Sequence, residues 1–70
     1  MITEEVREKL IYIPFRNSKL IQGILKENNK EVYSTKYIAN VFRGRYENLD
    51  IEEAYYILNK RMKFDSKFKN

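Results

Sequence analysis

The chain contains neither cysteine nor histidine, and this absence limits how so short a sequence can fold. With 70 residues it forms one small domain, and a chain of this size buries only about 60% of the surface that its unfolded form exposes. No disulfide and no Cys/His zinc site can supplement the core. Stability must therefore come from packed aliphatic and aromatic side chains, which are plentiful: eight Ile, six Tyr and four Phe.

The spacing of these apolar residues predicts an all-α fold, a small bundle of four short helices in a single domain over residues 1–64. The expected helices cover residues 3–11, 17–27 and 34–44, and a fourth begins near Asp50. The positions expected on the buried faces are Val6, Leu10, Leu20, Ile21, Ile24, Leu25, Ile38, Val41, Phe42, Ile51, Ala54, Tyr55, Leu58 and Met62.

Residues of known preference mark the ends of these helices. Thr3 and Ser34 are good N-caps, whereas the Asn residues of "ENNK" and Gly44 suit the left-handed conformation that closes a helix. Pro14 breaks the chain after the first helix. In the connector "KEVY" we expect Val32 to point inward. The segments "LIYI" and "KEVY" leave a small two-stranded ribbon possible as an alternative.

The C-terminal segment 65–70 is polar and basic, and we expect it to be frayed. The tail "KRMKFDSKFKN" is a solvated end on the simplest interpretation. The alternatives are an arm that contacts phosphates or, through Phe64 and Phe68, a segment that docks on a partner.

The net charge of +4 is unevenly distributed along the chain. Residues 34–46 include no acid and residues 60–70 carry five cations against one acid, whereas "ENLDIEE" between them is acidic. Such blocks are typical of a protein that binds a polyanion, although the same charges also serve solubility. No apolar run approaches the roughly 20 residues of a membrane span, and the acidic N-terminus is unlike a secretory signal, so we expect a soluble, cytoplasmic protein.

The residue types needed for catalysis are missing. The chain has no His, no Cys and no glycine-rich phosphate loop, since its only glycines are Gly23 and Gly44. The acids Glu47, Asp50, Glu52 and Glu53 lack the alternation and central Gly of a calcium loop and fit the first turn of a helix better. We therefore expect no enzyme, no catalytic residue, no metal and no cofactor.

Residues 34–48, "STKYIANVFRGRYEN", combine a helical apolar stripe with a polar face that is almost free of acids. With about 100° per residue, Lys36, Asn40 and Arg43 fall within roughly a 60° arc opposite Ile38. A face that serves only solubility usually mixes Glu with Lys, because pairs of opposite charge stabilise a helix. The missing acids favour a helix that lies against something negative.

The side chains on this face are those that recognise nucleic acid. Asn can bond an adenine edge, Lys or Arg can bond guanine, and Thr can meet the methyl group of thymine. The helix start, together with Ser34, can hold a phosphate. The hydroxyl of Tyr37, which flanks the helix, is a further candidate for a phosphate contact.

The segment "STKYIANVFRGR" resembles the recognition helix of the phage repressor and Cro-like helix-turn-helix family. The shared pattern is a Ser/Thr cap, an Ile or Val four residues on, a second apolar pair, and a Gly followed by Lys or Arg. The resemblance covers residues 34–63, since "RYENLDIEEAYYILNKR" is similar to the family's closing loop and helix, whereas the connector "ILKENNKEVYS" lacks the family's usual Gly. It implies base contacts by Thr35, Lys36 and Asn40, and phosphate contacts by Ser34, Arg43 and Arg45.

These features predict a small protein that binds double-stranded DNA sequence-specifically. Examples are a repressor, a Cro-like transcription regulator or an excision accessory factor of a phage or mobile element. Because specific binding usually comes from dimers on paired half-sites, a homodimer or cooperative binding to repeated sites is expected. The alternative is a phage- or plasmid-encoded inhibitor or adaptor that binds a host protein through its basic, tyrosine-rich surface, since Tyr and Arg are enriched at interface hot spots.

Overall fold

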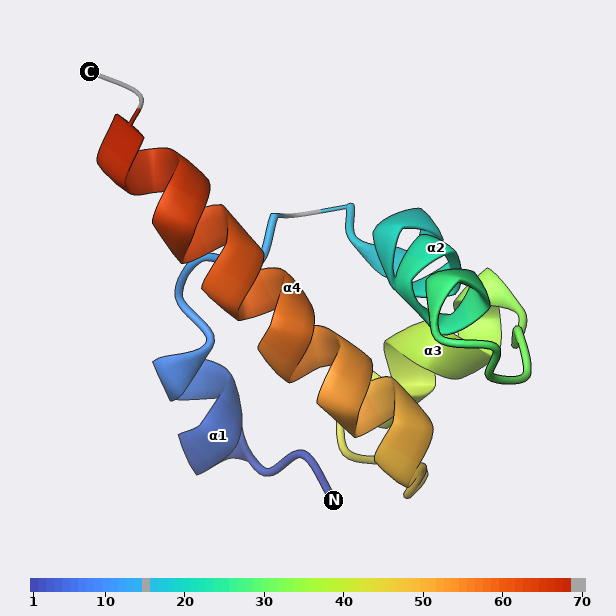
Figure 1. The fold of residues 1–70 in the computed structure, drawn as a ribbon. Coiled ribbons are helices and arrows are strands. Elements are labelled where there is room, and N and C mark those ends of the chain that lie inside the picture. Colours follow the sequence, from blue (N-terminus) through green and yellow to red (C-terminus); the bar gives the residue numbers. More distant parts are fainter. Residues whose placement is uncertain (15, 69–70) are drawn as a thin grey trace.

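The protein is all-helical, as the apolar spacing predicts (Figure 1). The computed structural model describes residues 1–14 and 16–68, with side chains described as far as residue 65. Its helices are α1 (Glu4–Lys9), α2 (Ser18–Glu27), α3 (Thr35–Phe42) and α4 (Leu49–Phe68). These described residues include no strand, so the ribbon considered for "LIYI" and "KEVY" is not formed.

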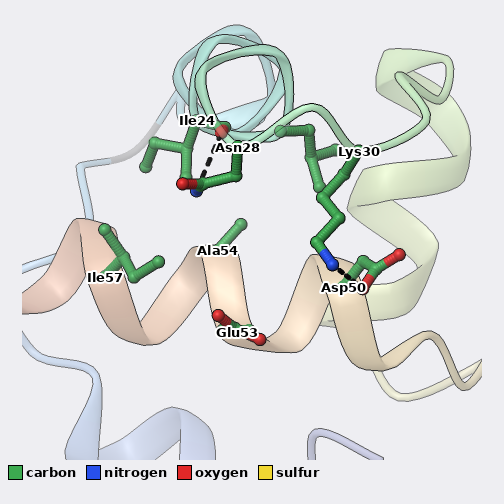
Figure 2. Close-up of a pocket in the computed structure, with 8 residues that line it drawn as sticks. Ile24, Asn28, Lys30, Asp50, Glu53, Ala54 and Ile57 are labelled. Atoms are coloured by element: carbon green, nitrogen blue, oxygen red, sulfur yellow. Dashed lines mark hydrogen bonds and ion pairs between the residues drawn. The ribbon is translucent and has the colours of Figure 1, made fainter.

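The long helix α4 is the element against which the others pack. Figure 1 shows α2 and α3 on one side of α4 and the short α1 on the other. Helix α4 contacts both α2 and α3, which also contact each other. In Figures 1 and 2, α2 is seen close to end-on while α3 is seen from the side, so these two helices cross rather than run parallel.

Most of the positions predicted to be buried form the core. It consists of Ile2, Leu10, Ile21, Ile24, Leu25, Ile38, Val41, Ile51, Ala54, Tyr55 and Leu58, with Val6, Phe42 and Met62 packed at its edge. Ile2 was not predicted, although it is completely buried.

Two predictions of burial were wrong. Leu20 is 42% exposed because it lies about 100° from Ile21, outside the stripe that faces the core. Val32 is 48% exposed. Its neighbour Tyr33 is half-buried, and the Tyr33 carbonyl accepts a hydrogen bond from Gln22 Nε2 at 2.8 Å. Tyr33 therefore provides the apolar contact of this connector with the core, and Val32 beside it is left at the surface.

Tyr55 joins three parts of the fold. Its buried ring stacks on Phe42 of α3 with a centroid distance of 4.6 Å. The Tyr55 hydroxyl donates to Asn17 Oδ1 at 2.7 Å, and Asn17 Nδ2 donates to the Pro14 carbonyl at 3.1 Å. A buried phenol needs such a partner, and this one ties α4 to the segment before α2. Burial raises the pKa of the Tyr55 hydroxyl well above its ordinary value.

The helix ends largely follow the predicted preferences. The hydroxyls of Thr3 and Ser34 each accept the amide N–H three residues later, at 3.2 Å. Helices α2 and α3 close through left-handed residues, Asn29 with φ 56° and Gly44 with φ 81°. In both cases the N–H of the next residue bonds a carbonyl five residues earlier, which satisfies groups that the helix end leaves unpaired.

Helix α4 differs from the prediction at both ends. It begins at Leu49, because Asn48 Oδ1 accepts the N–H of Ile51 at 3.1 Å and caps the helix before Asp50. It continues to Phe68, so residues 65–68 are helical rather than frayed, and Figure 1 shows this end extending past the other helices. No Gly or Pro follows Gly44 to stop the helix. Residues 69 and 70 of the predicted tail lie outside the described residues.

The segment around α1 is held on the end of α3 by Arg7. Its Nη1 donates to the carbonyls of Ile2 at 3.3 Å and Phe42 at 3.0 Å. The N-terminal ammonium lies 2.8 Å from a carboxylate oxygen of buried Glu52 and 3.6 Å from Glu47. The hydrogen bond to Glu52, more than the charges of the two acids, raises the pKa of this ammonium above its ordinary value of 8.0.

None of the described helices combines the length and the apolarity that a membrane crossing requires.

Gly44 is the first position at which this packing can be tested. A Cβ at Gly44 would lie 2.8 Å from the Ile2 carbonyl oxygen. Gly44→Ala should therefore lower the free energy of unfolding by about 1–3 kcal/mol, because alanine strains the left-handed backbone and displaces the N-terminal segment. Urea unfolding followed by circular dichroism measures the change.

Gly23→Ala is the matched control, because nothing lies within 4 Å of the Cβ position there. Alanine should stabilise this helix interior by roughly 0.5–1 kcal/mol. Equal stabilities of the two variants would contradict the role given to Gly44.

Stability should also decrease in alkaline solution, in two steps. The N-terminal ammonium has a raised pKa in the folded protein, so its stabilising contribution is complete below 8.0 and is lost as the pH rises through the folded-state value. The Tyr55 hydroxyl adds a second loss above 10.0, because the unfolded chain releases this proton more readily than the folded one.

Urea unfolding at a series of pH values measures both steps. Tyr55→Phe, which has no phenolic proton, should abolish the second step and leave the first. A free energy of unfolding that stays constant from about pH 7 to about pH 11 would show that neither group is linked to folding.

Candidate nucleic-acid interface

Helix α3 has two distinct faces. Its apolar stripe is buried against the core, whereas Thr35, Lys36 and Arg43 are exposed. Asn40 is half-buried beside them. The side chains predicted to contact nucleic acid therefore lie on the outer side of the helix.

A hollow of about 760 Å³ opens along one edge of this face. Thr35 and Ala39 of α3 and its C-cap residue Arg43 line one side of it, and Ser18 and Lys19 at the start of α2 line another. The small side chain of Ala39 leaves room for a ligand to approach the helix. The hollow thus joins the outer edge of α3 to the beginning of α2.

The charged side chains among the described residues that line this hollow are all positive: Arg7, Arg16, Lys19 and Arg43. Arg7 is already occupied, because its guanidinium donates to two backbone carbonyls. The other three are exposed, and in the described part of the chain no acid forms an ion pair with them. Uncompensated cations around a concave surface attract anions.

Two helix ends add to this positive potential. The beginnings of α2 and α3 border the hollow, and neither helix has an acid in its first turn. By contrast, α1 begins with two glutamates, and α4 has Asp50 and Glu52 in its first turn. The N-terminal end of a helix carries roughly half a positive charge, which such acids offset. At α2 and α3 that partial charge is left without a local acid.

Asn17 fixes the segment that precedes α2. It is the N-cap residue of α2, yet its side chain makes no capping hydrogen bond and instead accepts the hydroxyl proton of Tyr55. This bond positions the neighbouring Arg16 and Ser18 at the hollow. It also leaves the first N–H groups of α2 without a side-chain acceptor, so they remain available to an anion.

Ser34 and Tyr37, two of the predicted phosphate contacts, have contacts of their own within the fold. Ser34 Oγ caps α3 by accepting the Tyr37 N–H at 3.2 Å. The Tyr37 ring is stacked between Tyr33 and Tyr46, at centroid distances of 4.9 and 5.3 Å. None of these three rings lines the hollow, so they form a separate surface of α3.

The residues predicted to contact DNA thus lie partly in the hollow and partly outside it. Thr35 and Arg43 line the hollow. Lys36 and Asn40 lie outside it on the same helix, and Arg45 is exposed just after the turn that ends α3. The structure therefore brings two of the predicted contacts into one concave site and leaves the others on the adjoining surface.

Arg16 and Lys19 belong to the site, but sequence reasoning missed them. Their positions depend on how the segment before α2 packs against α4. One signal was present in the sequence: Lys19 lies in the first turn of α2, which contains no acid, although the helix dipole disfavours a cation there.

A second concavity lies between the end of α2 and α4 (Figure 2). Its volume is about 10 Å³, roughly the room needed for one water molecule. Lys30 Nζ lies 3.8 Å from Asp50 at its edge. It is a packing gap rather than a binding site.

Among the described residues no cluster of three or more His, Cys, Asp or Glu is arranged to hold a metal ion.

Comparisons of the chain with family models, with curated proteins and with solved structures found no match. The fold and its surface define a small helical protein with an anion-attracting concave face.

Substitutions of Ser34 separate its capping role from the predicted phosphate contact. Ser34→Ala should lower the free energy of unfolding by about 1 kcal/mol, because the Tyr37 N–H loses its acceptor. Ser34→Asp keeps an acceptor and places a negative charge at a helix start, so its stability should equal or exceed that of the wild type. Urea unfolding measures both variants. Wild-type stability of Ser34→Ala would show that the cap contributes nothing.

Proposed function

We propose that this protein binds double-stranded DNA, with α3 lying in the major groove. The observation that carries the proposal is the acid-free hollow between the starts of α2 and α3. A duplex has one negative charge for about every 1.7 Å of its axis, and neutralising these charges supplies much of the affinity of DNA-binding proteins. A cationic concave surface is complementary to such a backbone.

The exposed side chains near the hollow suit the two kinds of contact that DNA recognition needs. Thr35, Lys36 and Asn40 have the donors, acceptors and methyl group that read base edges. Cations on either side of them suit phosphates, which orient a protein on the duplex without reading sequence. The cations that we assign to phosphates are Arg16, Lys19, Arg43 and Arg45.

The arrangement of α2 and α3 supports a docking mode of the helix-turn-helix type. The two helices cross, and the outer face of α3 is not covered by another helix (Figure 1). With 8 residues, α3 is about 12 Å long and reaches only a few base pairs. We therefore propose that two copies bind paired half-sites, as a repressor or related regulator of a phage or mobile element would.

The salt dependence of duplex binding tests this proposal. A labelled duplex enriched from a randomised pool should bind with an affinity that falls steeply as salt rises, with a log–log slope of about −4 for four to five phosphate contacts. Lys19→Gln should reduce this slope by about one, because one phosphate contact is lost. Asn40→Ala removes no charge, so it should leave the slope unchanged while discrimination between sequences falls by about 1–3 kcal/mol.

Lys26→Gln is the matched control, because it removes the same charge from the last turn of α2, away from the hollow. Its slope should equal that of the wild type. A flat salt response, or no duplex binding at low salt, would overturn the proposal. A stoichiometric host protein that stays bound after nuclease treatment and at high salt would favour the inhibitor alternative instead.

A further inference from the structure

The three stacked tyrosines form a surface that the proposed duplex contacts do not use. Tyr33, Tyr37 and Tyr46 come from the connector before α3, from α3 itself and from the loop after it. Their rings are close to parallel, with interplanar angles of 23° and 10°. Segments on both sides of α3 thus contribute to one continuous aromatic stack.

The two ends of this stack differ. Tyr33 is half-buried, and its carbonyl is held by the side chain of Gln22. Tyr46 at the other end is 49% exposed. Within the described residues its only ring partner is Tyr37, so one face of the phenol has no aromatic neighbour. The stack therefore ends at a ring that is about half exposed.

Arg45 is the unpaired charge next to Tyr46 in the sequence. It is exposed and makes no ion pair within the described part of the chain. Glu47 follows Tyr46 and shares the N-terminal ammonium with Glu52, at 3.6 and 2.8 Å, so its charge is partly offset. A planar group with an attached negative charge suits an exposed aromatic ring whose neighbour in the chain is an unpaired arginine.

We propose that Tyr46 stacks on an unpaired nucleobase, while Arg45 contacts the phosphate of the same strand. Aromatic side chains that follow a cationic surface are a common way of binding single-stranded nucleic acid, and each stacked base contributes about 1–3 kcal/mol. Tyr37 and Tyr33 support the Tyr46 ring from behind, so the platform is formed before the ligand arrives.

This binding mode goes beyond the proposed duplex contacts. A base inside a duplex is covered on both faces by its neighbours, so Tyr46 can stack only on a base that is unpaired. The stack also lies apart from the hollow that we assign to duplex binding. The two proposals share Arg45 but not Tyr46, so they can fail independently: one is tested at Tyr46 with single strands and the other at Lys19 and Asn40 with duplexes.

Tryptophan provides a local probe for the stack, since the chain contains no Trp. In Tyr46→Trp, the indole fluorescence should be quenched when a deoxyadenosine strand of about eight nucleotides is added, because the base covers the ring. An abasic strand of the same length carries the same phosphates without bases and should leave the fluorescence nearly unchanged. A ribose strand, compared with the deoxyribose strand, shows whether the site prefers RNA or DNA.

Tyr56→Trp is the matched control. Tyr56 is 48% exposed, almost the same as Tyr46, but it lies on α4 outside the stack. Its replacement should show no base-dependent quenching. Equal quenching at both positions, or equal effects of the abasic and normal strands, would overturn the proposal.

Affinities of the wild type and two further variants complete the test. Tyr46→Ala should weaken binding of the deoxyadenosine strand about tenfold, and Tyr46→Phe should stay within about twofold of the wild type, because the stacking face remains. Circular dichroism checks that both variants fold. A folded Tyr46→Ala variant that binds the strand as tightly as the wild type would also overturn the proposal.

Discussion

The rest of the structure depends on Tyr55. Its ring packs on α3, its backbone belongs to α4, and its hydroxyl is hydrogen-bonded to Asn17, the residue just before α2. In a chain without cysteine or histidine, one buried phenol thus joins three of the elements that line the hollow. The apolar core stabilises the fold as a whole, but this hydrogen bond fixes where the start of α2 stands relative to α3. The shape of the concave face follows from that placement.

The arrangement of charge follows from the same packing. Helices α1 and α4 carry acids in their first turns, as helices in soluble proteins commonly do, whereas α2 and α3 do not. The two exceptions are the helices whose beginnings meet at the hollow. Most of the chain's acids lie elsewhere, including the buried Glu52 beside the N-terminal ammonium. The modest net charge therefore understates how positive this one surface is.

The sequence predicted well the features that depend on contacts between near neighbours in the chain. Apolar spacing within α3 and α4 identified their buried faces, and short-range hydrogen bonds made Ser34, Asn29 and Gly44 recognisable as helix ends. The error at Val32 arose where a distant residue decides the outcome, because Gln22 bonds the carbonyl of the neighbouring Tyr33. The error at the end of α4 was local, because no residue after Gly44 interrupts the helix.

In the candidate site too, local patterns were predictable from the sequence and long-range contacts were not. The acid-free face of α3 was visible as a pattern, because all its members lie on one helix. Arg16 and Lys19 were not, since they reach the hollow only through the packing of Asn17 against Tyr55. The stack that ends at Tyr46 was equally hidden, because its rings come from three consecutive but differently folded segments. Contacts between residues far apart in sequence leave no periodic signal.

The docking of the N-terminal segment has a consequence for the order of folding. Helix α1 has only six residues and would not be stable by itself. The N-terminal segment that contains α1 contacts Phe42, Gly44 and Glu52, which lie half the chain or more away from their partners. When the chain refolds, this segment therefore gains its native contacts only after α3 has formed and the first turn of α4 is in place.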